Sequence, residues 1–168
     1  YPVWKVMAMF QKIGEFHLAY PVGDEIRDTD LSDETDTCIY VIARQAGEGA
    51  DRKREKGDYL LSDLEIDNLK KCREHYRNLI VVLNCGSSLD LSPLKEIRPS
   101  AVLFYGQAGE EGGNALGRIL SGEATPSGKL TDTWAEKYED YPVARIAHPE
   151  KLEENYEEGI YVGYRWFD

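Results

Sequence analysis

Three runs of apolar, largely β-branched residues predict the strands of a sheet: Cys38–Ala43 (CIYVIA), Leu79–Asn84 (LIVVLN) and Ala101–Gly106 (AVLFYG). In the first two runs the apolar residues follow one another without polar residues between them, which predicts strands that are buried on both faces. Strands of this kind are typical of parallel sheets with helices on both sides.

A helical pattern separates the first two runs, in the segment 62–76 (SDLEIDNLKKCREHY). Ser62 is the expected N-cap, and Glu65, three residues later, completes a capping box. Leu61 and Ile66 have the spacing of a hydrophobic staple. Strand, helix and strand in this order predict a βαβ unit.

Further elements are expected on either side of this unit. The segment 110–122 (EEGGNALGRILSG) predicts a helix that follows acidic residues and ends at Gly122. Residues 3–13 have helical spacing, and residues 15–22 (EFHLAYPV) resemble a strand. The acidic stretch 24–36 lacks the spacing and the glycine of an EF-hand, so it predicts a solvated connector.

The alternation of strands and helices predicts an α/β fold: a three-layer α/β/α sandwich with a mainly parallel sheet, flavodoxin-like in general architecture. The length of 168 residues favours one domain, 1–168. Its regular βαβ core is expected at about 16–133 and includes a short strand near 129–133. From about 134 to 168, an irregular segment is expected to wrap around the core. The aromatic ending IYVGYRWFD predicts partial packing on the domain and an apolar patch for a neighbouring domain.

Composition excludes some classes of partner. The chain has 31 acidic residues against 20 Lys and Arg, a formal net charge of -11, so neither nucleic acid nor an anionic membrane surface is an expected partner. No window reaches the roughly 18 consecutive apolar residues of a membrane-spanning helix. Three separate cysteines in apolar patterns predict buried thiols, and neither they nor the three dispersed histidines indicate a metal site or a cofactor. Free cysteines, and the lack of a signal peptide in this segment, favour the cytoplasm.

The candidate for chemistry is Glu48, which lies between two glycines directly after the first predicted strand. Functional sites of open α/β sheets lie at the carboxyl ends of the strands. The segments 84–88 (NCGSS) and 106–113 (GQAGEEGG) follow the other two strands, so three loops are expected to converge at this edge. A carboxylate flanked by glycines can approach a ligand closely. The tripeptide by itself is nevertheless more typical of a simple turn, and no dinucleotide-binding G-x-G-x-x-G is present.

Four segments read together indicate a family. RQAGEGADR with KGDYLLSD, VVLNCGSSLDL, GQAGEEGGNALGRILSGEATPSGKLTDTW and YEEGIYVGYRWFD occur in this order. From about Cys38 to Asp168 the chain resembles the second, α/β sandwich domain of family 3 glycoside hydrolases, the β-glucosidase group. The PSGKL and GYRWFD segments carry the resemblance most strongly.

The resemblance implies a fragment of a larger multidomain enzyme, a retaining β-glycosidase that hydrolyses β-linked glucosides or xylosides. Its cleft would be shared with a (β/α)₈ barrel of the same polypeptide, which supplies an aspartate nucleophile. Glu48 matches the general acid/base glutamate of the family, with Ala46 where serine is usual. Because this chain contains no barrel, it is expected to be inactive alone. The alternative is a non-catalytic α/β module whose loops bind a sugar or another small ligand.

Five residues near Glu48 are expected to support its loop or to reach the substrate cleft: Arg44, Asp51, Arg52, Asp58 and Tyr59. Asp51 and Arg52 are expected to anchor the loop through an internal ion pair. For Asp58 and Tyr59, a turn that leads into the next helix is an equal or better interpretation. Glu110 and Glu111 are explained by the favourable position of acids at a helix start.

Overall fold

A computed structural model of the chain describes residues 23–45, 52–145, 156 and 158–167. Its sheet has three parallel strands in the order β1–β2–β3, with β1 at Thr37–Ala43, β2 at Asn78–Asn84 and β3 at Ala101–Phe104. The α/β class and all three predicted strands are therefore confirmed. The helix predicted at 3–13 and the strand predicted at 15–22 lie outside the described residues.

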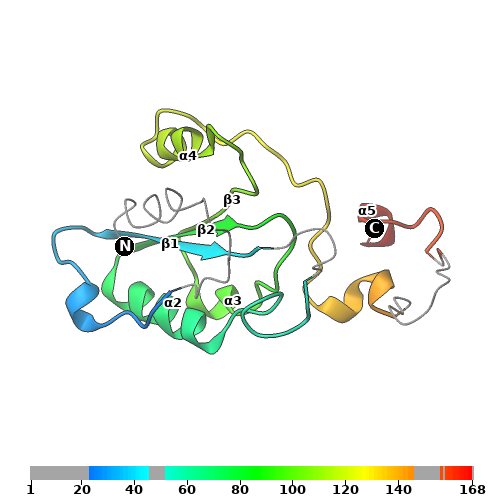
Figure 1. Ribbon diagram of the computed structural model, residues 1–168, viewed down its shortest axis with the longest axis horizontal. Coiled ribbons are helices and arrows are strands. Elements are labelled where there is room, and N and C mark those ends of the chain that lie inside the picture. Colours follow the sequence, from blue (N-terminus) through cyan, green and yellow to red (C-terminus); the bar gives the residue numbers. More distant parts are fainter. Residues whose placement is uncertain (1–22, 46–51, 146–155, 157, 168) are drawn as a thin grey trace, which may run out of the picture.

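Helices follow each of the three strands (Figure 1), and the sequence pattern predicts two of them but not the short helix between β2 and β3. α2 (Asp63–His75) connects β1 to β2, α3 (Leu94–Ile97) connects β2 to β3, and α4 (Gly112–Leu120) follows β3. The predicted capping box is present: Ser62 Oγ accepts from Glu65 N at 3.1 Å, and Glu65 Oε2 accepts from Ser62 N at 2.7 Å. This arrangement satisfies two backbone donors that the first turn of the helix leaves unpaired.

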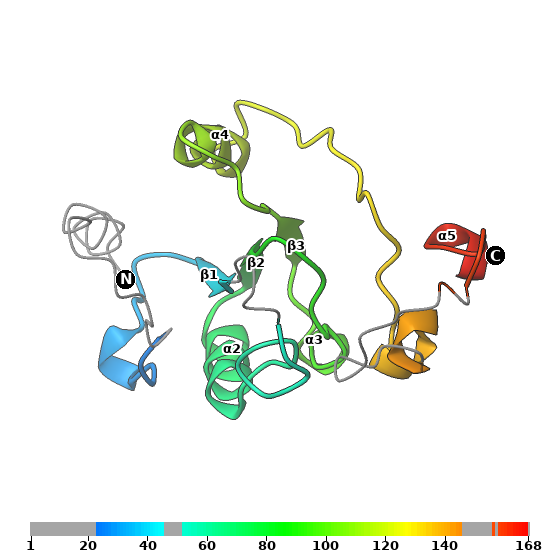
Figure 2. The same ribbon diagram turned by 45° about the vertical axis from the view of Figure 1, so that its right-hand side comes forward.

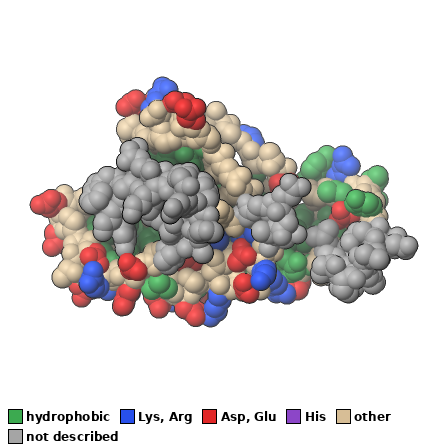
Figure 3. Space-filling model, in the orientation of Figure 1, with side chains coloured by type: hydrophobic (Ala, Val, Ile, Leu, Met, Phe, Trp, Pro, Cys, Tyr) green, Lys and Arg blue, Asp and Glu red, His purple; other side chains and the backbone are tan. Residues whose placement is uncertain are grey.

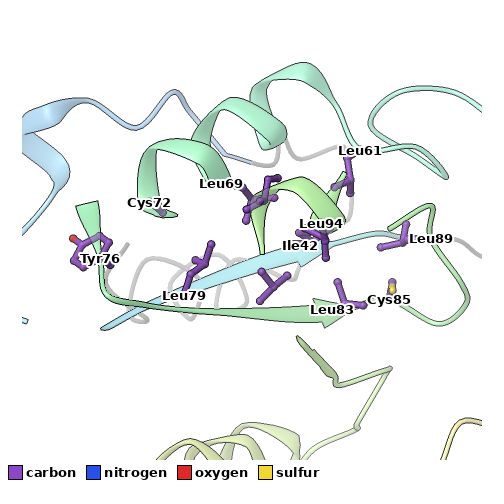
Figure 4. Packing of buried hydrophobic residues seen from close by; sticks show 12 residues of the cluster. Ile42, Leu61, Leu69, Cys72, Tyr76, Leu79, Leu83, Cys85, Leu89 and Leu94 are labelled. Atoms are coloured by element: carbon purple, nitrogen blue, oxygen red, sulfur yellow. The ribbon is translucent and has the colours of Figure 1, made fainter. Parts of the chain in front are cut away.

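The hydrophobic core lies between the sheet and the pair α2 and α3 (Figure 4). Figure 4 shows Leu69 of α2 and Leu94 of α3 lying over Ile42 of β1 and Leu83 of β2. Full burial of such a side chain contributes about 1.5–3 kcal/mol, so this layer dominates the stability of the unit. The predicted burial of the thiols is confirmed for Cys72 and Cys85, whereas Cys38 of β1 is only partly buried and packs against the cluster.

The opposite face of the sheet differs from the prediction. α4 lies on that side (Figure 2), but it does not cover β1, where Ile39 and Val41 are each 48% exposed. The prediction that both faces are buried is therefore wrong for β1. It is confirmed for the central strand β2, where Val82 is completely buried. The reason is position: β1 is an edge strand in the described sheet, and a continuous apolar run does not reveal whether a third layer reaches it. The three-layer arrangement stays a prediction.

The prediction of a short strand near 129–133 is wrong, because the structure has no strand there. After α4 the chain follows the outside of the molecule in an extended path (the yellow segment in Figure 1) and pairs with no described strand. It is attached instead through a side chain: Trp134 contacts Phe104 of β3 edge to face, with ring centroids 5.2 Å apart. An extended segment becomes a strand only where a sheet edge accepts its hydrogen bonds, and its own residues cannot specify that edge.

The C-terminal segment folds into short helical turns, at Tyr138–Asp140, Pro142–Arg145 and α5 (Tyr164–Phe167). Trp166 Nε1 donates to Asp140 O at 2.9 Å, and the ring of Phe167 lies 6.2 Å from that of Tyr141. Much apolar surface remains exposed at this end of the molecule (Figure 3). The exposed side chains are Tyr156, Ile160, Tyr161, Val162, Tyr164, Trp166 and Phe167. The ending thus packs on the turns at 138–145, whereas its packing on the βαβ core and the neighbouring domain that would cover the exposed side chains stay predictions.

The acidic connector is held against α2. Asn68 accepts at Oδ1 from Ile26 N at 2.8 Å, and Lys71 Nζ donates to Ile26 O at 2.8 Å. Among the described residues, no helix is long and apolar enough to cross a membrane, and no group of three His, Cys, Asp or Glu side chains could hold a metal ion.

Candidate active site

The carboxyl edge of the sheet begins with Arg44, the residue after β1. Its backbone N–H donates to Asn84 O of β2 at 3.0 Å, which continues the strand pairing by one residue. Its guanidinium turns toward α2 and meets Glu65 in two parallel hydrogen bonds, Nη1 to Oε1 at 2.7 Å and Nη2 to Oε2 at 2.8 Å. Both side chains are only 5% exposed. The glutamate of the capping box thus also neutralises the cation at the end of β1.

Arg52 is the second arginine of this edge, and Asp58 is its main partner. Arg52 Nε donates to Asp58 Oδ1 at 2.7 Å, and Nη2 donates to the Asp58 carbonyl at 2.8 Å. Arg44 Nε donates to the same carbonyl oxygen at 2.6 Å. The other oxygen of the Asp58 carboxylate, Oδ2, accepts from Lys53 N at 2.5 Å. We refer to the three residues Arg44, Arg52 and Asp58 as the arginine clasp.

The arginine clasp reaches the loop after β2. Arg52 Nη1 donates both to Ser87 Oγ and to the Ser88 carbonyl, each at 2.9 Å. The loop after β3 also reaches this place, because a Cβ at Gly86 would lie only 3.1 Å from Cδ of Gln107. The loops after β2 and β3 therefore meet at the carboxyl edge, beside Arg52, as predicted, whereas the loop with Glu48 lies outside the described residues and its part in this convergence stays a prediction.

The pKa of Asp58 is lowered below its usual value. Burial by itself would raise this pKa, but the hydrogen bonds from Arg52 and from the backbone of Lys53 outweigh it. The carboxylate is thus held ionised as an acceptor inside the clasp. This position supports a structural role for Asp58 within the turn, and its side chain is only 24% exposed.

A pH dependence follows from this shift. Because the pKa of Asp58 is lower in the folded than in the unfolded chain, its ionised form stabilises the fold fully above about pH 4, the unfolded value. That contribution is lost as the pH falls through the folded pKa. In urea titrations the stability difference between wild type and Asp58→Asn should narrow progressively as the pH is lowered below about 4. A difference that stays constant over this range would contradict the assignment.

Tyr59 directly follows Asp58 of the arginine clasp and is 8% exposed. Its ring packs edge to face on Tyr138, with centroids 5.4 Å apart, and Arg54 lies over the Tyr138 ring at 4.8 Å. Burial, chiefly, raises the pKa of Tyr59 to about 12, so the hydroxyl is neutral at physiological pH. Tyr59 therefore joins the turn after the clasp to the C-terminal segment.

The remaining candidates are placed as follows. Glu48 and Asp51 lie outside the described residues, so the predicted pair of Asp51 with Arg52 stays a prediction. Glu110 and Glu111 are exposed, and Glu111 Oε2 accepts from Asn114 Nδ2 at 2.6 Å at the start of α4, as expected for a helix terminus.

Sequence reasoning missed two partners in this network, Glu65 as the counter-ion of Arg44 and Ser87 as a contact of Arg52. Glu65 had a local signal, because its capping role is visible in the sequence. Its pairing with an arginine 21 residues earlier had none.

Comparison with known proteins identifies the family. Residues 23–164 match the model of the glycosyl hydrolase family 3 C-terminal domain. A β-glucosidase of Ruminococcus albus is 39% identical over 137 residues, which cover 82% of this chain and 14% of the relative. Beta-glucosidase A of Butyrivibrio fibrisolvens is 38% identical, over 83% of this chain and 20% of its own length. The chain thus spans a minor part of these relatives.

Solved structures agree. Beta-glucosidase 3B of Thermotoga neapolitana, in complex with glucose, superposes with a TM-score of 0.78 at 31% identity, covering 98% of this chain and 25% of that one. A β-glucosidase of Paenibacillus barengoltzii gives a TM-score of 0.75 at 39% identity, over 80% of this chain and 15% of its own. This chain therefore belongs to the family of glycosyl hydrolase family 3 C-terminal domains.

Proposed function

We propose that this chain is the part of a retaining β-glycosidase that supplies its general acid/base, Glu48, to a cleft shared with a (β/α)₈ barrel of the same polypeptide. One observation carries the proposal: the segment with Glu48 starts and ends at the arginine clasp, on the carboxyl edge of a parallel sheet. Sites of open α/β folds lie at this edge. The similarity to proteins named β-glucosidases supports β-linked glucosides as the substrate class.

The chemistry requires a second carboxyl group. A retaining glycosidase uses two, roughly 5–5.5 Å apart: a nucleophile that attacks the anomeric carbon and an acid that protonates the leaving oxygen. Glu48 fills the second role, and the nucleophile comes from the barrel. The same glutamate then acts as a base and activates the water that hydrolyses the glycosyl-enzyme. A closed cleft removes water around Glu48, and this desolvation raises the pKa of a carboxylic acid.

The stereochemistry of the product tests this proposal. The full-length protein that contains this chain should hydrolyse an aryl β-glucoside, and proton NMR should detect the β-anomer of glucose first, before mutarotation. The chain by itself should show no turnover. Initial formation of the α-anomer, or steady hydrolysis by the chain alone, would refute the division of roles. Binding of glucose without any hydrolysis by the full-length protein would favour the non-catalytic sugar-binding module.

A further inference from the structure

Two of the three cysteines face each other where β1 packs on α2. Side chains alternate along a strand, and Ile39 and Val41 of β1 lie on its half-exposed face. Cys38 therefore lies on the other face, where it packs against the core cluster. Cys72 of α2 belongs to that cluster and is 1% exposed. Figure 4 shows Cys72 on the side of α2 that turns toward the sheet.

Two side-chain contacts fix the position of β1 on α2. Cys38 and Tyr40 lie two residues apart on one face of the strand, and Asn68 and Cys72 lie one helical turn apart on one face of the helix. The Tyr40 hydroxyl is hydrogen-bonded to the Asn68 side chain. The Cys38 thiol is hydrogen-bonded to the Cys72 thiol. The contact of the two sulfurs thus follows from the packing of two regular elements.

The two thiols have different surroundings. Cys38 lies near the start of an edge strand and is partly exposed, whereas Cys72 is buried. The hydrogen bond from Cys72 lowers the pKa of Cys38, although burial opposes this effect. The same contact, together with burial, raises the pKa of Cys72. The thiolate is the form of cysteine that attacks an oxidant, so Cys38 is the attacking thiol of the pair and Cys72 is its neighbour.

We infer that Cys38 and Cys72 form an oxidation site at which a hydroperoxide converts the two thiols into a disulfide between β1 and α2. First, the Cys38 thiolate attacks one oxygen of hydrogen peroxide, the O–O bond breaks, hydroxide leaves and Cys38 becomes a sulfenic acid. Then the Cys72 sulfur attacks Sγ of Cys38, and the S–O bond breaks. The departing oxygen takes up the proton of the Cys72 thiol and leaves as water. Two thiols are oxidised by two electrons, and one peroxide is reduced to two molecules of water.

This inference does not depend on the proposed function. The segment from Cys38 to Cys72 contains the whole arginine clasp, and the disulfide would close this segment into a loop. A closed loop restricts the unfolded chain, which stabilises the fold. The two sulfurs, already in contact, must approach to a bond of about 2 Å. The half-exposed outer face of β1 leaves this strand room to move toward α2.

The test uses the full-length protein that contains this chain. The protein is reduced, freed of reductant and treated with hydrogen peroxide, and its remaining thiols are alkylated in denaturant. Mass spectrometry of the tryptic peptides without reduction should show Cys38 linked to Cys72, with a mass about 2 Da below the sum of the two reduced peptides. Trypsin separates Cys72 from Cys85, because Arg73 and Arg77 lie between them. Dithiothreitol should restore both thiols.

Cys85 is the matched control within the same molecule. It is also buried, but its Sγ donates to the Ser87 carbonyl at 3.2 Å and not to another thiol. It should be alkylated to the same extent with and without peroxide, and Cys85→Ser should form the disulfide as the wild type does.

Cys72→Ser separates the roles of the two thiols. Without Cys72, the sulfenic acid of Cys38 should persist and react with dimedone. Cys72→Ala replaces this variant if serine prevents folding at the buried position. The inference is overturned if peroxide leaves Cys38 of the wild type free for alkylation, if it carries Cys38 on to the sulfinic acid without a disulfide, or if Cys38 is linked to Cys85 in place of Cys72.

Discussion

Glu48→Ala in the full-length protein is expected to lower kcat/KM for alkyl β-glucosides about 10²- to 10⁴-fold, equivalent to about 3–5 kcal/mol of activation free energy. The physical reason is the leaving group: an alkoxide is too basic to depart without a proton. With dinitrophenyl β-glucoside, kcat/KM should change little, because that leaving group is stable as an anion. Steady-state kinetics with both substrates measures the contrast.

Azide gives a second measure of the same variant. Without a base to activate water, the glycosyl-enzyme of Glu48→Ala should accumulate and limit kcat for the activated substrate. Azide needs no base, and it fits the space that the missing carboxylate leaves. It should therefore raise kcat and produce the β-glucosyl azide, which NMR identifies.

The control for this experiment is Glu96→Ala, which removes an exposed carboxylate from α3. It should behave as the wild type with both substrates and with azide. Equal losses of Glu48→Ala with good and poor leaving groups, together with no response to azide, would show that Glu48 only shapes its loop. The acid would then be sought first at Glu110 or Asp51.

Arg44→Met is expected to destabilise the chain by about 3–5 kcal/mol, because it leaves the buried Glu65 carboxylate without its cation. Glu65→Gln should lower the free energy of unfolding by a similar amount, because it leaves the buried guanidinium of Arg44 without its anion. Glutamine still accepts the hydrogen bond of the helix cap. The double variant should be much less destabilised than the sum of the two, since no unpaired charge remains. Urea denaturation of the chain and its variants measures these differences.

The matched control for this pair is Lys56→Met. Lys56 and Asp63 also form an ion pair, but their side chains are 61% and 73% exposed, and such pairs contribute about 0–1 kcal/mol. If Arg44→Met lowers the free energy of unfolding as little as Lys56→Met does, water reaches the Glu65 carboxylate and the pair of Arg44 and Glu65 is not buried in solution.

Local features of this protein were predictable because their causes lie within a few residues of one another. The capping box of Ser62 and Glu65 spans one helical turn, and both predicted hydrogen bonds are present. The three strands follow from continuous runs of apolar residues, whose burial is favourable in any α/β sheet. The position of the loops at one edge of the sheet then follows from parallel strands, since their carboxyl ends must meet there.

The errors concern features that depend on a distant partner. The segment 129–133 has a suitable strand pattern, but it finds no described edge to pair with. The apolar run of β1 does not say whether another layer covers Ile39 and Val41, and in the described structure they are half exposed. A residue's own propensity cannot determine what packs against it.

By itself, the sequence determined the class of the fold, its three strands and the helices α2 and α4, and it predicts the edge of the sheet for a site and Glu48 as the candidate glutamate. Only the tertiary structure decided how that edge is held together. Asp58 meets Arg44 across 14 residues, and Arg44 meets Glu65 across 21. The reason is physical: short-range propensity acts between neighbours along the chain, whereas ion pairs act between neighbours in space, and folding alone establishes which residues those are.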